Sequence, residues 1–457
     1  MTTKTVHAYG NYSKELIQLF SNLNVKVGDH LLIETTDARI EGNLLPQTEM
    51  GDPDVIILKQ KNGYNVGIKY SKDLKIQTGG ESFRLEKFPK IRLKQKEDLP
   101  QISLLATGGT IASRIDYLTG GVFMASKPEE VFASLPELFD EVAFKSIIPL
   151  FQMASEDIGY KQWQVIAEAA AKEFEEETDG IVIMHGTDMM GYTSAALSFM
   201  LQNLPAPIAM TGGQRSSDRG SFDGALNLIS AARVAGKADF AKVCVVMHET
   251  TDDNTCLVSP GTRVRKMHTS RRDAFKTIGD IPYAKVLEDG KITMLRNDLP
   301  KRKEREVQLN TNYDPNVALI KIFPGISPEI LDWYIDKGIK GFIIEGTGLG
   351  HTPTYPPEDE KERSWAEPLK RAIDDGAFVG MTSQCIYGRT HPFVYRALRT
   401  NYKAGVTYLS DMISETALVK LGWVLGNTQN MEEVKKLMTT NIAGEITEKT
   451  NFGGYFK

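Results

Sequence analysis

Hydrophobic and polar positions alternate in short segments over the first part of the chain. Between about residue 25 and residue 85, brief apolar runs are separated by turns, and no long helical period interrupts them. Asn62-Gly63 is a strong hairpin signal between two of these runs. A segment with helical spacing, SKELIQLFSNL, precedes them. The pattern predicts a small SH3-like β-barrel domain over residues 1–85, with an amphipathic helix near its start.

From Gln101 the pattern changes to continuous apolar runs, each followed by a turn rich in Gly, Ser, Thr or Asp. The runs are ISLLA, SIIPLFQM, GIVIMH, PIAMTGG and KVCVVMH. Helical periods occur between them, for example at residues 161–177 and 192–204. Continuous apolar strands that alternate with helices are typical of a parallel sheet covered on both faces. We therefore predict an α/β domain over residues 101–295.

A second α/β pattern follows a charged passage. The runs NVALIKIFPG, GFIIEGTGLG and AFVGMTSQ alternate with the helical segment SPEILDWYIDKG. These predict a smaller α/β domain over residues 315–426, closed by a helical C-terminal tail over residues 427–457. Linkers are expected at residues 86–100, where the sequence is rich in Lys, and at residues 296–314.

The composition limits what this organisation can mean. The chain has 457 residues, 41% of them hydrophobic and 25% charged, which suits a large core in two or three domains. A net charge of −5 argues against a strong nucleic-acid binder, although a local basic patch can exist within that average. Three cysteines without CxxC spacing argue against a disulfide framework, and we expect reduced thiols, mostly in the core. Neither a secretory signal nor a run of ~18 apolar residues is present, so we expect a cytoplasmic protein.

The turns after three of the strands carry the candidate chemistry. Ligands of open α/β sheets bind beyond the carboxyl ends of the strands. TGGT, ASED and HGTD all occupy that position, so we expect these turns to converge on one crevice. Glycines let a backbone approach a ligand closely, which makes Thr110 a candidate nucleophile and Thr107 a weaker one. The alternative is that TGGT is only a tight turn.

A threonine hydroxyl is a poor nucleophile without a base or a positive field beside it. The candidate activators are Thr187 and Asp188 in HGTD, and Lys266 in RVRKMHTS. A lysine held partly out of water beside Asp188 can accept a proton through Thr187. Each of these residues also has an ordinary interpretation, since Asp188 suits a helix N-cap, Thr187 a turn and Lys266 a charged surface. Only their combination favours catalysis.

Five segments in order resemble the signatures of the bacterial-type L-asparaginase family. They are ATGGTIAS, MASEDI, MHGTDMMGYTSAAL, MTGGQRSSDRGSFDGALNL and RVRKMHTSRRDAF. The resemblance implies an asparaginase-like α/β fold with Thr110 as the nucleophile. It implies that Thr187, Asp188 and Lys266 form the second catalytic group.

The same resemblance implies how a substrate is bound. Ser155 and Asp188 would hold the α-carboxylate and α-amine of an amino-acid amide, with Gly109 beside them, and Tyr117 would be the tyrosine of the family's mobile lid. The chain departs from the family at Glu156, where asparaginases commonly carry Gln. This carboxylate either meets the α-amine or faces solvent.

Two further features resemble a narrower family, the D subunits of archaeal glutamyl-tRNA(Gln) amidotransferases. They are the N-terminal barrel with its linker, and the run TSQCIYGRTHPFVYRALR with the closing tail. This resemblance implies that glutamine is hydrolysed and that ammonia passes to a partner, the E subunit (GatE). The partner would use ATP and Mg²⁺ to amidate Glu-tRNA(Gln) and would make most of the tRNA contacts. A homodimer of this chain would lie at the centre of a D2E2 complex, and this chain would bind no cofactor of its own.

Other interpretations remain open from the sequence. The chain could be a stand-alone asparaginase or glutaminase, or an RNA- or protein-binding subunit whose hydrolase site is inert. The basic segments RVRK, TSRRDAFK and PKRKERE are either solvated loops or phosphate contacts. His185, His248 and His268 have no metal-ligand spacing, so we expect core or supporting roles and no metal site.

Overall fold

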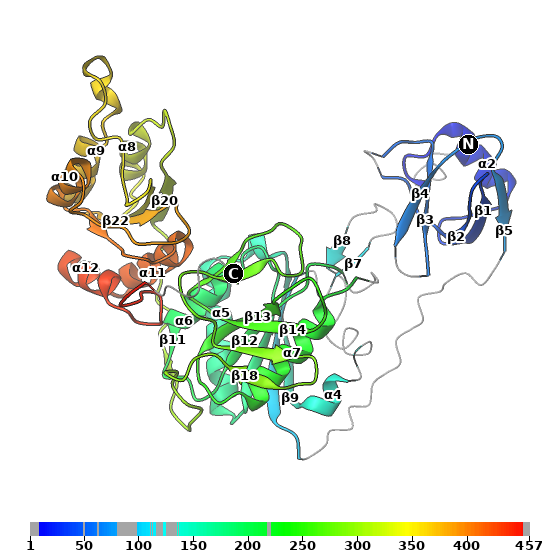
Figure 1. Cartoon of the computed structure of the whole chain (residues 1–457), viewed down its shortest axis with the longest axis horizontal. Coiled ribbons are helices and arrows are strands. Elements are labelled where there is room, and N and C mark those ends of the chain that lie inside the picture. Colours follow the sequence, from blue (N-terminus) through cyan, green and yellow to red (C-terminus); the bar gives the residue numbers. More distant parts are fainter. Residues whose placement is uncertain are drawn as a thin grey trace.

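The computed structural model describes residues 9–48, 51–61, 64–79, 98–109, 111, 113–115, 122–124, 135, 137–216 and 221–450 (Figure 1). The hairpin turn at Asn62-Gly63 and most of the predicted linker 86–100 lie outside these residues. The predicted domain boundaries stay predictions.

The first domain combines one helix with an antiparallel sheet. Helix α2 (Lys14–Asn22) begins where the Ser13 hydroxyl accepts a hydrogen bond from the Leu16 N–H, an ordinary N-cap. Its buried face, with Leu16 and Phe20, packs on the sheet. The sheet order is β4-β3-β2-β1-β5, and the strands are β1 (His30–Glu34), β2 (Arg39–Leu44), β3 (Val55–Lys59), β4 (Asn65–Lys69) and β5 (Lys75–Thr78). The predicted small β domain is therefore confirmed.

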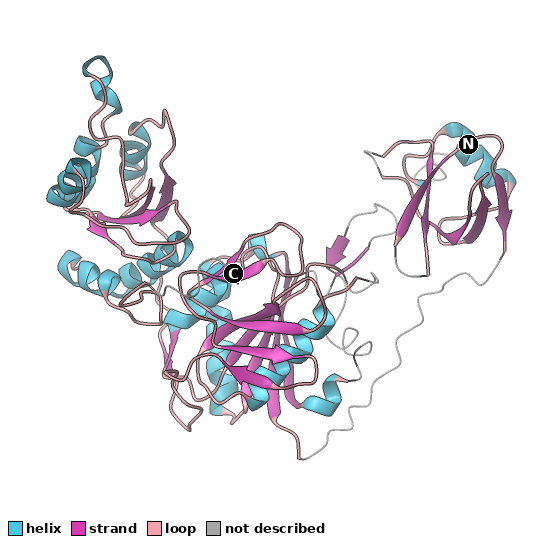
Figure 2. Ribbon diagram, viewed as in Figure 1, coloured by secondary structure: helices cyan, strands magenta, loops and turns pink. Residues whose placement is uncertain are grey.

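The large domain is built on an eight-stranded sheet in the order β18-β17-β14-β13-β12-β10-β6-β9 (Figures 1 and 2). The five strands from β9 to β13 in this order pair in parallel. The strands are β6 (Gln101–Gly108), β9 (Ala143–Met153), β10 (Gly180–Met184), β12 (Ile208–Thr211), β13 (Val243–His248), β14 (Thr255–Pro260), β17 (Ala284–Leu287) and β18 (Ile292–Met294). The last three pair antiparallel, so the sheet is mixed, whereas the sequence predicted only its parallel part.

Helices cover both faces of this sheet. They are α4 (Leu138–Glu141), α5 (Tyr160–Glu175), α6 (Met190–Met200) and α7 (Gly224–Lys237). One core lies between the sheet and α5 and α6, and the other lies between the sheet and α4 and α7. Every residue of β10 is buried because neither face meets water, which explains its continuous apolar sequence. The α/β prediction is confirmed.

Three short strand pairs and a 3₁₀ turn complete the large domain. They are β7 (Ser113–Ile115) with β8 (Val122–Met124), β11 (Leu201–Gln202) with β19 (Gln308–Leu309), β15 (Val264–Lys266) with β16 (Phe275–Thr277), and η2 (Ser155–Asp157). The predicted helix over 192–204 ends at Met200, because the chain turns there into β11 and pairs with β19.

The small domain contains a four-stranded parallel sheet in the order β20-β21-β22-β23. Its strands are β20 (Val317–Lys321), β21 (Gly341–Gly346), β22 (Phe378–Ser383) and β23 (Thr407–Tyr408). Its helices are α8 (Glu329–Asp336), η3 (Glu358–Arg363), α9 (Ala366–Asp374), α10 (Arg396–Ala404), α11 (Ser414–Asn427) and α12 (Met431–Thr439). Residues of α8 and α9 share one core with the sheet, and residues of α11 and α12 share the other.

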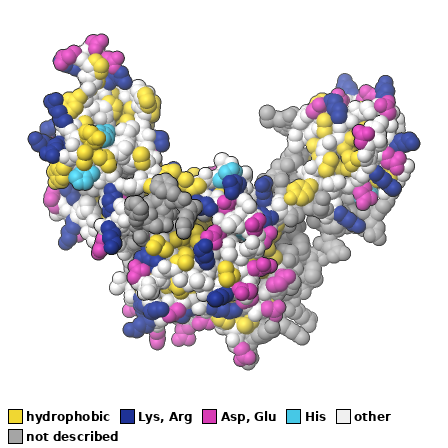
Figure 3. Space-filling view, viewed as in Figure 1, with side chains coloured by type: hydrophobic (Ala, Val, Ile, Leu, Met, Phe, Trp, Pro, Cys, Tyr) yellow, Lys and Arg dark blue, Asp and Glu magenta, His cyan; other side chains and the backbone are white. Residues whose placement is uncertain are grey.

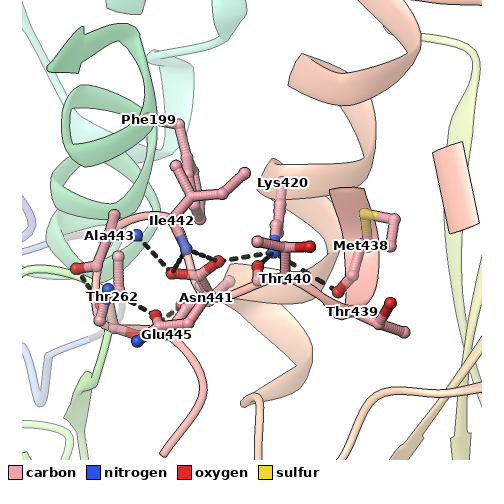
Figure 4. Close-up of polar contacts among 12 residues, drawn as sticks. Phe199, Thr262, Lys420, Met438, Thr439, Thr440, Asn441, Ile442, Ala443 and Glu445 are labelled. Carbon is pink, nitrogen blue, oxygen red and sulfur yellow. Dashed lines mark hydrogen bonds and ion pairs between the residues drawn. The ribbon is translucent and has the colours of Figure 1, made fainter. Parts of the chain in front are cut away.

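The C-terminal segment after α12 ties the two α/β domains together. Lys420 of α11 and Glu445 are both fully buried and form an ion pair of 2.5 Å (Figure 4). The Glu445 carboxylate also accepts hydrogen bonds from the N–H groups of Ile442 and Ala443. From the large domain, the Thr262 hydroxyl donates to the carbonyl of Ala443. Helix α11 also packs against α6. Of the predicted tail, the described residues form α12 and an irregular segment from residue 440 to residue 450, which we call the strap.

Two of the three cysteines, Cys244 and Cys256, are buried as free thiols, and Cys385 is exposed. Within the described residues, no helix is long and apolar enough to cross a membrane.

Candidate active site

Three turns meet at the carboxyl ends of the parallel strands. Gly109, which follows β6, has a φ of +89°, and a Cβ added to it would lie 2.5 Å from the backbone N of Gly186. A Cβ added to Gly186 would lie 2.8 Å from the Cβ of Ser155. Only glycine permits such close backbone approach, and the left-handed φ at Gly109 also favours it. The turns TGGT, ASED and HGTD therefore converge as the sequence predicted.

Lys266 joins this cluster from a different part of the chain. Its Nζ lies 2.8 Å from the Thr187 Oγ1 and 2.9 Å from the Asp188 Oδ1. Thr187 is buried, the Lys266 side chain is 13% exposed, and the Asp188 side chain is 64% exposed. The ammonium group is thus held at the buried end of an ion pair whose carboxylate faces the open side.

The hairpin β15–β16 places the lysine there. Lys266 ends β15 and lies opposite Phe275 of β16. The next turn is closed by a hydrogen bond of 2.6 Å from the Met267 N–H to the Ala274 carbonyl. Val264 of β15 and Phe275 of β16 are both buried in the core of the large domain, which anchors the hairpin.

Ser155 lies at the other side of the HGTD turn. Its side chain is 2% exposed, and its Oγ lies 3.4 Å from the backbone N of Met189 and 3.4 Å from the Glu156 Oε2. Glu156 itself is exposed. Its carboxylate is therefore near the cluster and also open to solvent.

The remaining predicted nucleophiles differ in where they lie. Thr107, the weaker candidate, is fully buried within β6, and its hydroxyl donates to the carbonyl of Met184. It is a structural link between β6 and β10 and is not available to a substrate, so that candidate was wrong. Thr110 follows Gly109 directly but lies outside the described residues, as does Tyr117.

The histidines have separate surroundings. His185 is fully buried, its Nδ1 lies 2.6 Å from the Gly186 carbonyl, and burial lowers its pKa to about 4. His248 is buried between Asn227 and Asp253, at 2.6 Å and 3.0 Å, and His268 is exposed. Among the residues that the structure describes, no group of three or more His, Cys, Asp or Glu side chains could hold a metal ion.

The sequence did not identify Asp223, which supports the turn after β12 beside the site. This fully buried carboxylate accepts hydrogen bonds from the N–H groups of Gln214 and Arg215 and from the Asn227 side chain. It thereby fixes the turn after β12, where a Cβ on Gly212 would lie 3.1 Å from the Thr187 Cγ2. The segment SFDGALNL contained the signal, because an acid just before a small-residue helix is an N-terminal pattern.

Two arginines that precede Lys266, one just before β15 and one on it, were also missed. Arg263 is 1% exposed and pairs with Asp411 of the small domain at 2.8 Å. Arg265 pairs with Glu415, also of the small domain, at 3.0 Å. The sequence segment RVRK was interpreted as a loop or a phosphate contact, but these two charges join domains.

Comparison with known protein families agrees with this architecture. A model of the asparaginase N-terminal domain matches residues 101–300, and a model of the glutaminase/asparaginase C-terminal domain matches residues 316–438. A model described as the GatD N-terminal domain matches residues 25–78. The thermostable L-asparaginase of Thermococcus kodakarensis superposes with a TM-score of 0.68 at 32% identity, covering 76% of this chain and all of that one. Fold and site together define an amidohydrolase of the asparaginase class.

Relatives that include the first domain narrow the class. The D subunit of glutamyl-tRNA(Gln) amidotransferase from Pyrococcus furiosus is 48% identical over 93% of this chain and 96% of its own length. The corresponding protein from Methanopyrus kandleri is 42% identical over 97% of this chain and 96% of its own length. The chain belongs to the family of glutamyl-tRNA(Gln) amidotransferase D subunits.

Proposed function

We propose that the chain is the glutaminase component of a tRNA-dependent amidotransferase. It hydrolyses the side-chain amide of glutamine, and the ammonia converts Glu-tRNA(Gln) to Gln-tRNA(Gln). The observation that carries this proposal is the Thr187–Lys266–Asp188 cluster, held directly against the turn that precedes Thr110. Family membership over nearly the whole chain supports it.

The proposed chemistry is acyl transfer in two steps. The Thr110 Oγ attacks the carboxamide carbon, and its proton is taken up through the Thr187 hydroxyl by the Thr187–Lys266–Asp188 cluster. The C–N bond breaks, the proton moves to the leaving nitrogen, and ammonia departs. Water then attacks the acyl-enzyme and releases glutamate. Backbone N–H groups at the Gly109–Thr110 turn and at Thr187 are the proposed donors to the developing oxyanion.

Substrate binding is proposed for the polar groups beside this cluster. The Ser155 hydroxyl and the N–H groups of the HGTD turn suit the α-carboxylate of the amino acid. The exposed carboxylate of Asp188, and that of Glu156, suit its α-amine. Tyr117 is proposed as the lid residue that excludes water during the reaction.

The partners are proposed from the family. The E subunit (GatE) would receive the ammonia and would use ATP and Mg²⁺ to activate the glutamyl group. Two copies of this chain would form the centre of a D2E2 complex. This chain would bind glutamine and no metal or cofactor.

Ammonia release tests the proposal. We expect the purified chain with its GatE partner and Glu-tRNA(Gln) to release ammonia from glutamine, and the Thr110→Val variant to release none while keeping its fold. Thr110→Val preserves shape and deletes only the hydroxyl. Glutaminase activity retained by that variant would remove the nucleophile assignment.

A second candidate function is a stand-alone amino-acid amidohydrolase. It is favoured by the coverage of the entire Thermococcus kodakarensis L-asparaginase by the two α/β domains. Equal ammonia release by the chain alone, especially from asparagine, would support it. Glutamine and asparagine differ by one methylene, which a pocket distinguishes by only about 1–3 kcal/mol, so both amides have to be measured.

A further inference from the structure

One stretch of the small domain contains no acidic residue. Residues 376–410 include no Asp or Glu, although the chain has 59 such residues in 457, about one in eight. The same stretch contains Arg389, Arg396, Arg399 and Lys403. In a chain whose net charge is −5, this is a local concentration of positive charge.

Three of these cations lie on one face of α10. Arg396, Arg399 and Lys403 are spaced i, i+3 and i+7, and all three are exposed, while Leu398 and Asn401 on the opposite side are buried. None of the three has a carboxylate partner among the residues that the structure describes.

Three cations of the basic segments that the sequence singled out differ in this respect. Arg271 pairs with Asp273 at 2.9 Å, Arg272 with Asp253 at 2.9 Å, and Lys301 with Asp239 at 2.8 Å. Their charge is compensated locally. The charge of Arg396, Arg399 and Lys403 is not compensated by a carboxylate of the described residues, so these side chains can attract an anionic partner.

Exposed aromatic rings lie among the cations. Tyr355, Phe393, Tyr395 and Tyr402 are 51%, 47%, 56% and 49% exposed. The Arg396 guanidinium lies over the Tyr355 ring at 4.2 Å from its centroid. The Thr400 hydroxyl, followed by the charges of Arg396 and Lys403, lowers the pKa of Tyr355.

Figure 3 shows hydrophobic and histidine side chains gathered on this side of the small domain, with Lys and Arg beside them. Of the four acids of η3, Glu358 and Glu360 are paired with Lys361 and Arg363. We call the surface formed by Tyr355, Phe393, Tyr395, Arg396, Arg399 and Lys403 the α10 face.

We propose that the α10 face binds tRNA directly, with its cations on phosphates and its aromatic rings stacked on unpaired bases. Stacking on exposed aromatic side chains together with backbone contacts from Lys and Arg is the usual way proteins hold single-stranded RNA. The choice of tRNA among RNAs rests on the proposed function, which makes Glu-tRNA(Gln) the molecule to be amidated.

The test is binding of a tRNA(Gln) transcript to the full chain at several salt concentrations. We expect R396Q/R399Q/K403Q to weaken binding and to lower the slope of log K against log[salt] by about 2 to 3, because each lost phosphate contact releases about one counterion fewer. Tyr395→Ala should weaken binding by about 5- to 100-fold, and Tyr395→Trp, which keeps a stacking ring, should retain it.

The matched control removes the same charge elsewhere. Lys69, Arg271 and Lys301 are exposed and paired with acids, and K69Q/R271Q/K301Q should bind the transcript as the unaltered chain does. Equal losses in both triple variants would overturn the proposal, as would unchanged binding in the α10 variant. Loss of self-association on sedimentation with RNA binding intact would also overturn it and would assign the face to contact between copies of the chain.

Glutamine hydrolysis measured on the same preparations separates the two proposals. The α10 residues lie in the small domain and take no part in the Lys266 cluster, so hydrolysis by the α10 variants should match that of the control variant. RNA binding that depends on α10 in a chain without glutaminase activity would sustain this inference and refute the proposed function.

Discussion

The hydroxyl of Thr187 and the ammonium of Lys266 lie 2.8 Å apart, although 79 residues separate them in the sequence. We expect Thr187→Val and Lys266→Met each to lower kcat for glutamine by about 10²- to 10⁴-fold, since each removes a member of the proton path. Steady-state ammonia release measures this.

Thr193→Val is the control for these two substitutions. Thr193 is also buried, but its hydroxyl accepts a hydrogen bond from the Trp163 indole, away from the cluster. Its loss should lower stability and leave kcat within about twofold. A kcat unchanged by Lys266→Met would exclude that lysine from the reaction.

His185 makes the stability of the large domain depend on pH. Burial lowers its pKa to about 4, below the value of about 6.5 expected in the unfolded chain. The neutral ring therefore contributes stability that is complete above pH 6.5 and is lost as the pH falls toward 4, by about 3 kcal/mol in all.

His185→Asn removes the titration and keeps a donor near the position of Nδ1. Denaturant unfolding at pH 7 and at pH 4.5 should show a smaller decrease for this variant than for the unaltered chain. Equal decreases would place the pH dependence in other groups.

At the residue scale, the sequence predicted which side chains gather but not their supports. Thr187, Asp188 and Lys266 were recognisable because they stand in segments with a known resemblance. The role of Asp223 was not, because the helix N-terminal signal in SFDGALNL does not show that this carboxylate is buried against the N–H groups of Gln214 and Arg215.

Among the elements, β15 depends on the small domain. Arg265 precedes Lys266 on this strand and pairs with Glu415 in the first turn of α11. Burial and the Glu415 carboxylate raise the pKa of Tyr192 on α6 to about 12, so this carboxylate also lies near the helix that follows Thr187 and Asp188.

We expect Glu415→Gln to lower kcat by about tenfold with little change in KM, since β15 would lose its anchor while the binding turns stay in place. Glu141→Gln is the matched control. It removes the carboxylate that pairs with Arg233 at 2.8 Å, on the other side of the sheet. Equal effects of the two substitutions on kcat would show that Glu415 contributes only to general stability and does not position β15.

Periodicity predicted most elements and could not give their direction. Runs such as KVCVVMH, which forms β13, are equally apolar whether the next strand is parallel or antiparallel, so the antiparallel β14, β17 and β18 were not foreseen. The early end of α6 at Met200 could not be predicted for a similar reason. Leu201 is buried in strand β11, and an apolar residue at this position fits a continuing helix equally well.

Across the whole molecule, stability depends on the buried pair of Lys420 and Glu445. We expect Lys420→Met to lower the free energy of unfolding by about 3–5 kcal/mol, because it leaves Glu445 charged and unpaired in the interior. Chemical denaturation measures the loss. The double variant K420M/E445Q should recover part of it, and a double variant less stable than the single one would show that the backbone contacts of Glu445 matter more than its charge.

The family and the order of its domains followed from sequence because whole segments carried the resemblance. The contact between domains did not, since Arg263, Asp411 and Glu445 come from three distant parts of the chain and no local pattern links them.

The strap after α12 is synthesised last, so the large domain is made before some of its contacts exist. Arg263 donates to the carbonyls of Gly444 and Glu445, which leave the ribosome long after β15 has been made. Domains of a nascent chain fold from the N-terminus onward, so the large domain emerges with the Ile278 carbonyl available to this guanidinium but without its partners Asp411, Gly444 and Glu445. We therefore expect β15, which carries Lys266, to reach its final position only after the strap has been synthesised. Chains whose synthesis stops before the strap would then not hydrolyse glutamine.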